Sequence, residues 1–223
     1  MRSSKKQPNS GPQAAFAKSI KSQTMPTKVS VQPAEEPVSR SEAKAWLKVD
    51  NTADDDLIDS LIIAARMAVE DFTNLKLISQ TIEEVYSCFP WVGYYRLGSH
   101  PSKYDAFKLT CSPLIAVTSI EYKATAAGYT TLDSSNYTAH TYQKPPIITP
   151  AYSLSWPEAI DFPEAVKITY TAGLSANAAG VPALFKNAIL KILTSWYEKR
   201  GENVKKLPTD VEYMLNIQRI IYW

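Results

Sequence analysis

The sequence predicts an α+β protein, a small bundle of about four helices with a mostly antiparallel β-rich insertion between the second and third helices. Near both ends of the chain apolar residues recur every three to four positions, as in amphipathic helices. Between about residues 79 and 172 the period shortens toward two, and β-branched and aromatic residues become frequent, which is typical of strands. Glycine and proline separate these short runs, so we expect turns between them.

Two helices are expected at the start of the folded part. Ser39 followed by Glu42 fits a capping box, in which each side chain satisfies a free backbone amide, so the first helix is predicted at 39–49. The second is predicted at 53–73, where apolar residues form a broad stripe. Three aspartates at 54–56 suit the positive end of its dipole.

Two more helices are expected after the β-rich insertion. The helix at 181–200 has proline near its start and a broad apolar face that should pack against the second helix. The helix at 209–220 is predicted to begin with a second capping box, formed by Thr209 and Glu212. The last four residues, 220–223, are strongly apolar, so we expect them to contact either the chain's own core or another protein.

The charge divides the chain into two parts. Residues 1–40 hold seven basic and two acidic residues, a net charge of +5, whereas the remaining residues carry −3. Polar and rich in proline, residues 1–38 are predicted to be a disordered basic arm, and residues 39–223 a single folded domain. The arm either binds a polyanion or an acidic protein surface, or is an inert tail. Its resemblance to a targeting sequence is weak. Its candidate polyanion-binding residues are Lys5, Lys6, Lys18, Lys21 and Lys28.

Several classes of protein are excluded by what the 223 residues lack. No apolar run approaches the roughly 18 residues that span a bilayer, so no membrane partner is expected. The two cysteines and two histidines show no metal-ligand spacing, and no glycine-rich phosphate loop occurs, so we expect neither metal nor cofactor. Glu83 and Glu84 are adjacent on a predicted strand and point to opposite faces, so they cannot act as a catalytic pair. We therefore do not expect an enzyme.

Two further features of the sequence bear on contact with other molecules. The helix at 53–73 opens with aspartates, which would face phosphates, so sequence-specific DNA binding through it is disfavoured. A longer aromatic loop at about 91–105 contains Trp91, Tyr94 and Tyr95, which either form an exposed contact surface or pack over the sheet.

From about residue 39 to 219 the chain resembles the phage head–tail connector (adaptor, or head completion) proteins of long-tailed bacteriophages and gene transfer agents. Four stretches carry the resemblance, and their order and spacing matter more than any one motif: 41–74, 112–123, 136–157 and 165–202. Within them lie Lys-x-x-Leu-x-Val-Asp at 44–50, Tyr-Thr-Ala-Gly at 170–173 and Trp-Tyr-Glu-x-Arg at 196–200.

The resemblance implies a structural protein of the virion neck, assembled in the bacterial host cytoplasm. Copies of such a subunit, typically twelve, form a ring beneath the portal protein. The ring extends the channel through which genomic DNA passes without sequence-specific contact, and it offers a docking surface to tail or stopper proteins. The C-terminal segment of the family engages the portal, which makes the docking candidates Arg219, Ile220, Ile221, Tyr222 and Trp223.

The alternatives are another neck protein, either a stopper or a tail terminator, or a DNA-binding or enzymatic protein. A stopper or terminator would bind the tail side of the neck and not the portal.

Overall fold

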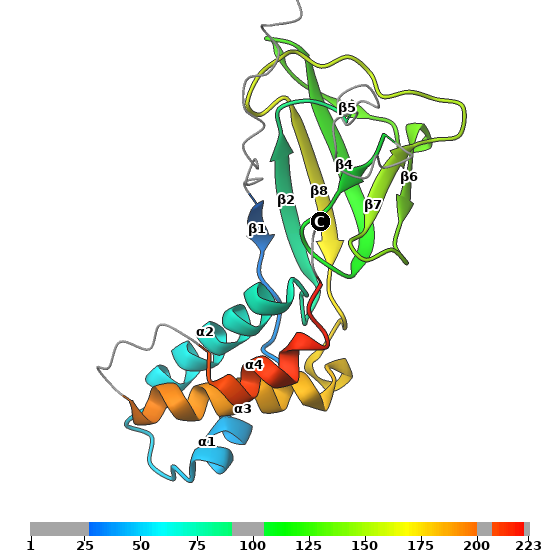
Figure 1. The fold of residues 1–223 in the computed structure, drawn as a ribbon. Helices are drawn as coiled ribbons and strands as arrows, with labels where there is room; N and C mark the ends of the chain where they lie inside the picture. Colours follow the sequence, from blue (N-terminus) through cyan, green and yellow to red (C-terminus); the bar gives the residue numbers. More distant parts are fainter. Residues whose placement is uncertain (1–26, 91–104, 200–206, 221–223) are drawn as a thin grey trace, which may run out of the picture.

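Helices and strands occupy opposite ends of the molecule in the computed structural model, which describes residues 27–90, 105–199 and 207–220 (Figure 1). Strands lie between the second and third helices, as predicted, and the α+β class is confirmed. We call the two ends the helical layer and the β layer.

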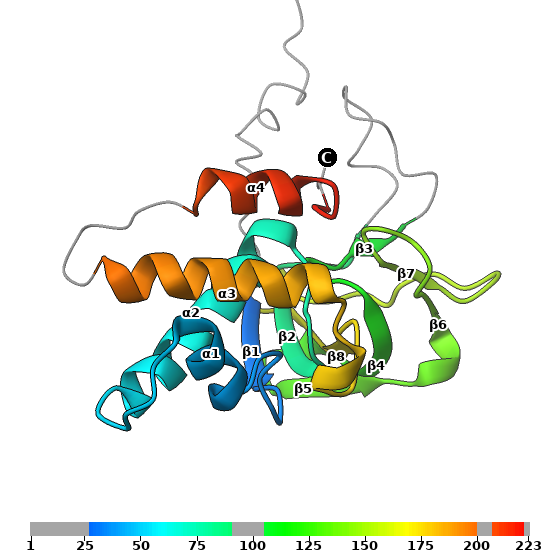
Figure 2. The ribbon, with the colours of Figure 1, turned by 90° about the horizontal axis from the view of Figure 1, so that it is seen from below.

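The helical layer consists of α1 (Arg40–Leu47), α2 (Asp55–Thr73), α3 (Ala183–Glu198) and α4 (Thr209–Asn216). Figure 2 shows α3 lying between α4 on one side and α1 on the other, with α2 crossing behind α3. The predicted packing of α3 on α2 is confirmed, because the apolar stripes of both helices share one buried core, which includes Ile58, Ile62, Val69, Phe185, Ile189 and Ile192.

One of the two predicted capping boxes forms. Glu42 accepts a hydrogen bond from the Ser39 backbone N–H (2.8 Å), and the Glu42 N–H donates to Ser39 Oγ (3.2 Å). The predicted box at Thr209 and Glu212 is wrong, because the N-cap residue of α4 is Pro208 and makes no side-chain cap. Proline holds the extended conformation that precedes the helix, so Thr209 is already its first helical residue.

The β layer contains two antiparallel sheets. The larger has the order β1-β2-β8-β4-β5. Its strands are β1 (Thr27–Val31), β2 (Gln80–Tyr86), β8 (Val166–Ala172), β4 (Leu114–Thr125) and β5 (Gly128–Leu132). The smaller has the order β3-β7-β6 and comprises β3 (Phe107–Lys108), β7 (Ile147–Pro150) and β6 (Tyr137–His140).

Burial along β2 and β8 alternates residue by residue, so one face of the larger sheet packs in the interior. Glu84 lies on this buried face and Glu83 on the other, as predicted. Phe89 and Trp156 stack within the β-layer core, with ring centroids 5.2 Å apart.

The structure corrects the predicted extent of the N-terminal arm. Residues 27–31 form β1, which pairs antiparallel with β2, and Val38 is fully buried in the helical core. Glu36 accepts a hydrogen bond from Arg66 Nε at 2.7 Å. Composition missed these contacts because β1 is held at a sheet edge by backbone hydrogen bonds, which polar residues form as readily as apolar ones. The rest of the predicted arm, residues 1–26, lies outside the described residues.

Short connecting segments hold the two layers together, and we call residues 74–79, 111–114 and 173–175 the waist. The Lys76 N–H donates to the Ser112 carbonyl (2.7 Å), the Leu174 N–H to the Lys76 carbonyl (2.9 Å) and the Ser79 N–H to the Ser175 carbonyl (2.8 Å). A Cβ atom at Gly173 would lie only 2.6 Å from Ser79 Cα, so the segments pass too closely for any side chain there. The waist is therefore a tight joint.

Candidate functional site

The C-terminal segment, predicted to dock on the portal, is fastened to the end of α2. The Ile220 N–H donates to the Thr73 carbonyl (2.9 Å), and Asn74 Nδ2 donates to the Ile220 carbonyl (2.8 Å). Ile220 is buried in the helical core, whereas Arg219 is exposed and its guanidinium lies 5.1 Å from the centre of the Phe72 ring. The sequence left two possible contacts for this segment, the chain's own core or another protein, and Ile220 packs in the chain's own core.

An exposed apolar pair, which the sequence analysis did not select, lies on α4 next to this segment. Tyr213 is 74% exposed and Ile217 is 86% exposed, while Val211 and Leu215 on the other face are buried. The signal was present in the sequence, because residues four apart share one face of a helix. Exposed tyrosine and isoleucine side chains of this kind are candidates for contact with another protein.

A cleft of about 420 Å³ opens beside the waist, between α2 and β1, and we call it the waist cleft. Met67 lines it from α2, Val29 lines it from β1, and Asn74, Lys76 and Cys111 contribute from the waist. Thr27, the first described residue, also lines the cleft, and Asn74 holds Ile220. Both described ends of the chain therefore lie at this site.

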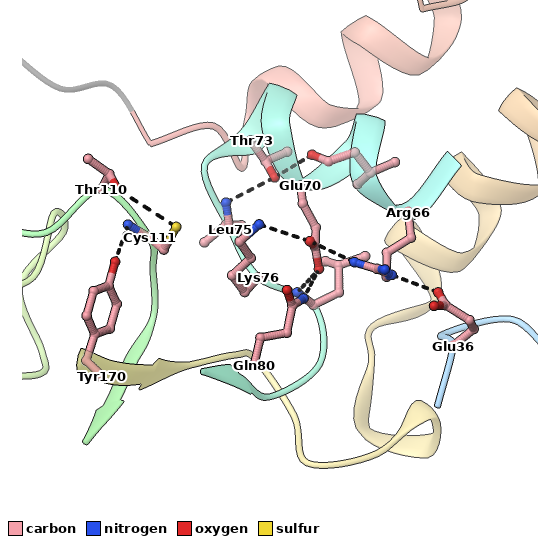
Figure 3. Close-up of polar contacts among 12 residues, drawn as sticks. Glu36, Arg66, Glu70, Thr73, Leu75, Lys76, Gln80, Thr110, Cys111 and Tyr170 are labelled. Atoms are coloured by element: carbon pink, nitrogen blue, oxygen red, sulfur yellow. Dashed lines mark hydrogen bonds and ion pairs between the residues drawn. The ribbon is translucent and has the colours of Figure 1, made fainter. Parts of the chain in front are cut away.

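A buried carboxylate joins α2 to the waist and to β2 (Figure 3). Glu70, whose side chain is 1% exposed, accepts hydrogen bonds from Arg66 Nη1 (3.1 Å), Lys76 Nζ (3.2 Å), the Leu77 N–H (3.0 Å) and Gln80 Nε2 (2.8 Å). Two cations and two neutral donors thus meet one acid from three successive parts of the chain. The arrangement compensates the buried charge and fixes the orientation of the helical layer.

A second buried carboxylate lies in the β layer. Glu84 accepts hydrogen bonds from Tyr86 Oη (2.6 Å), the Thr110 N–H (2.9 Å), Thr110 Oγ1 and Tyr170 Oη. Burial, together with the negative charge of Glu84, raises the pKa of Tyr170. Burial also raises the pKa of the Cys111 thiol, so the thiol at the waist cleft is a poor nucleophile.

The remaining predicted residues are placed only in part. Lys28 is exposed on β1, opposite Glu83 of β2. Other candidates lie outside the described residues: Lys5, Lys6, Lys18, Lys21, Trp91, Tyr94, Tyr95, Ile221, Tyr222 and Trp223.

Over the described ranges, no group of three or more histidine, cysteine or acidic side chains is arranged to hold a metal ion. No described helix is both long enough and apolar enough to cross a membrane.

A comparison with protein families shows a match to part of the chain. Residues 41–142 match the family of phage gp6-like head-tail connector proteins. The matched segment, a little less than half of the chain, is similar to this family. It begins in α1 and continues past β6, so it covers both layers of the fold, and the resemblance predicted from the sequence is confirmed. The family supports a structural protein of the neck, which makes an enzyme unexpected.

Solved structures extend the likeness to nearly the whole chain. A chain in the neck of the empty gene transfer agent (GTA) particle, computed with C6 symmetry, has a TM-score of 0.70 at 20% identity, over 89% of this chain and 97% of that one. A chain of the native GTA virion has a TM-score of 0.70 at 19% identity, over 88% and 96%. A chain from the neck of the native GTA particle, computed with C12 symmetry, has a TM-score of 0.67 at 21% identity, over 89% of this chain and 96% of that one. A comparison with curated proteins gave no match.

Proposed function

We propose that the protein is a head–tail connector subunit that forms a ring under the portal, extends the DNA channel and docks tail or stopper proteins. The observation that carries this proposal is the family match over residues 41–142. The fold of GTA neck chains, which continues over about nine-tenths of the chain, supports it. Those neck structures were computed with C6 and C12 symmetry, which favours a ring of identical subunits, with twelve as the expected number.

Ring formation requires two different surfaces on each subunit, because neighbours in a closed ring meet head to tail. The tight waist lets each subunit present its helical and β layers in one fixed relation. This suits a ring that must keep its opening while DNA passes through it without sequence-specific contact.

The C-terminal segment is the proposed portal contact. Its root is fixed, since both the N–H and the carbonyl of Ile220 are hydrogen-bonded at the end of α2. Residues 221–223 continue from that point, and the exposed Tyr213 and Ile217 lie on the helix that leads to it. Large apolar and aromatic side chains are the usual anchors of protein interfaces, so we expect this region to supply most of the portal affinity.

Purified protein mixed with purified portal tests this assignment. Light scattering and electron microscopy should show a complex with several copies of the chain per portal ring. Removal of residues 221–223 should weaken the complex, while a matched change far from this end, Tyr152→Ser at a 98% exposed position, should not. Absence of any complex with an intact portal would contradict the proposal, and binding to tail components alone would favour a stopper or tail terminator.

The basic arm is the proposed contact with DNA. Residues 1–26 include Arg2, Lys5, Lys6, Lys18 and Lys21 and no acid. Neutralising phosphates releases counterions, so binding through the arm should weaken steeply as salt rises. DNA retention compared with and without residues 1–26 at two salt concentrations measures this. Equal retention by both proteins would identify the arm as an inert tail.

A further inference from the structure

We propose that the waist cleft is the resting site of the chain's own last three residues, 221–223, in the unassembled subunit. The site depends only on the subunit itself, so it can exist whatever partner the protein meets in the particle.

The position of Ile220 puts the tail within reach of the cleft. Its carbonyl oxygen lies 2.8 Å from Asn74 Nδ2, and Asn74 is one of the residues that line the cleft. Three extended residues span about 10 Å. Asn74 and Met67 are seven positions apart along α2, which is also about 10 Å at 1.5 Å per helical residue. The tail can therefore follow the α2 wall of the cleft from one to the other.

Part of the cleft lining suits the apolar side chains of the tail. Met67, which is 49% exposed, forms with Val29 and Cys111 the apolar part of a lining whose other nine residues are polar or charged. Its volume of about 420 Å³ lies within the 300–1,000 Å³ typical of ligand pockets. Ile221, Tyr222 and Trp223 would otherwise expose large apolar surfaces, and each aromatic residue can bury roughly 150–250 Å².

The cleft also contains a polar atom that lacks a partner. Gln80 is 2% exposed and lines the cleft, and within the described part of the chain its Oε1 accepts no hydrogen bond. Such an acceptor is costly to leave unpaired. The hydroxyl of Tyr222 and the indole N–H of Trp223 are both donors, so the tail brings the group that this acceptor needs.

The basic arm is the other segment rooted here, and strand direction disfavours it as the occupant. Thr27 pairs with Glu84 and Val31 with Thr81, so β1 runs toward the helical layer (Figure 1). The arm therefore leaves from the end of β1 that is farther from the helices, whereas the tail leaves directly beside α2.

A consequence follows if the proposed function holds. The tail cannot occupy the cleft and a portal surface at the same time, so only the fraction of subunits with a free tail is competent to dock. The apparent portal affinity is reduced by that fraction. Contact with the portal would withdraw the tail and leave the cleft open.

Thiol alkylation of the isolated subunit tests the site without any portal. In a Cys88→Ser background Cys111 is the only thiol, and it lines the cleft. Deleting residues 221–223 should make alkylation of Cys111 by iodoacetamide about tenfold faster, which corresponds to ~1.4 kcal/mol of tail binding. Met67→Asn, with the tail kept, should give part of the same increase. Tyr213→Ser, on the α4 face, should leave the rate unchanged.

Melting temperatures that all stay well above the temperature of the alkylation assay show that the changed rate comes from the cleft and not from unfolding. An unchanged rate after both the deletion and Met67→Asn overturns the proposal. A faster rate after removal of residues 1–26, but not of 221–223, assigns the cleft to the arm instead. A rate in the full chain that falls as protein concentration rises assigns it to the tail of a second copy. Loss of portal binding with an unchanged alkylation rate would leave the connector function standing without this site.

Discussion

Replacing Glu70 by glutamine tests whether the buried charge cluster holds the helical layer on the waist. Glutamine has almost the same shape but no charge, so Arg66 and Lys76 would lose the acid that they share at 3.1 and 3.2 Å. The side chains of Arg66 and Glu70 are only 2% and 1% exposed. Removing one partner of a buried ion pair costs about 3–5 kcal/mol, whereas an exposed pair contributes about 1 kcal/mol at most. The expected loss is at the lower end, about 3 kcal/mol, because Arg66 keeps Glu36.

Urea unfolding followed by circular dichroism measures this loss as a lower midpoint at unchanged slope. Asp210→Asn is the matched control, since it removes the acid of an exposed pair with Lys191 and should cost less than about 1 kcal/mol. A double-mutant cycle with Lys76→Met should recover part of the loss, because it removes the uncompensated cation. If Glu70→Gln and Asp210→Asn had equal small effects, the cluster would not be the joint between the layers.

Four smaller changes test other parts of the fold. Gly173→Ala should destabilise by about 1–3 kcal/mol in urea unfolding, because its Cβ would meet the Ser79 backbone at 2.6 Å. Ser39→Ala should cost about 1 kcal/mol in the same assay, since it removes the cap of α1. Ile220→Ala should cost about 2 kcal/mol through the cavity that it leaves in the helical core. Hydrogen bonds from Ser39 lower the pKa of Glu42, so Glu42→Gln should be less stable than wild type at neutral pH but equal to it in acid.

The sign of the pH effect follows from linkage. The folded state holds Glu42 ionised, so its contribution is present above the unfolded pKa, about 4.3, and is lost as pH falls through the lower folded value. Melting curves of both proteins across this range measure the difference. A stability difference between wild type and Glu42→Gln that widens in acid would contradict the assignment of the capping box. For Gly173→Ala, an unchanged stability would show that the waist can loosen.

The sequence predicted the helical layer well because its helices show a local periodicity of apolar residues. The stripe of α2 and the capping box of α1 depend on residues three or four positions apart, which a single sequence displays directly. The same rule failed at Thr209, where the competing proline at position 208 took the N-cap.

Long-range pairing was harder to predict. β1 is mostly polar, and its place is decided by pairing with residues of β2 that lie 50 to 57 positions later in the chain. Nothing near Glu70 in the sequence shows that Lys76, Leu77 and Gln80 will all turn toward it. In the sequence Glu70 resembles the charged residues that any surface helix carries, and only its burial in the structure distinguishes it from them.

Burial of part of the C-terminal segment was predicted, whereas its docking on the portal stays a prediction. Apolar residues at the C-terminus indicated a buried or bound segment, and Ile220 is indeed buried in the chain's own core. The α4 pair, Tyr213 and Ile217, was overlooked because a helix with two apolar stripes resembles one broad core-facing surface until its neighbours are known.

An electron-microscopy reconstruction of the neck of intact particles, with this chain identified in the density, tests the central claim most directly. The connector proposal predicts a ring of copies of this fold, twelve in number, directly beneath the portal, with Arg219 and residues 221–223 against the portal surface. A location on the tail side of another ring, or absence of the chain from the neck, would contradict it.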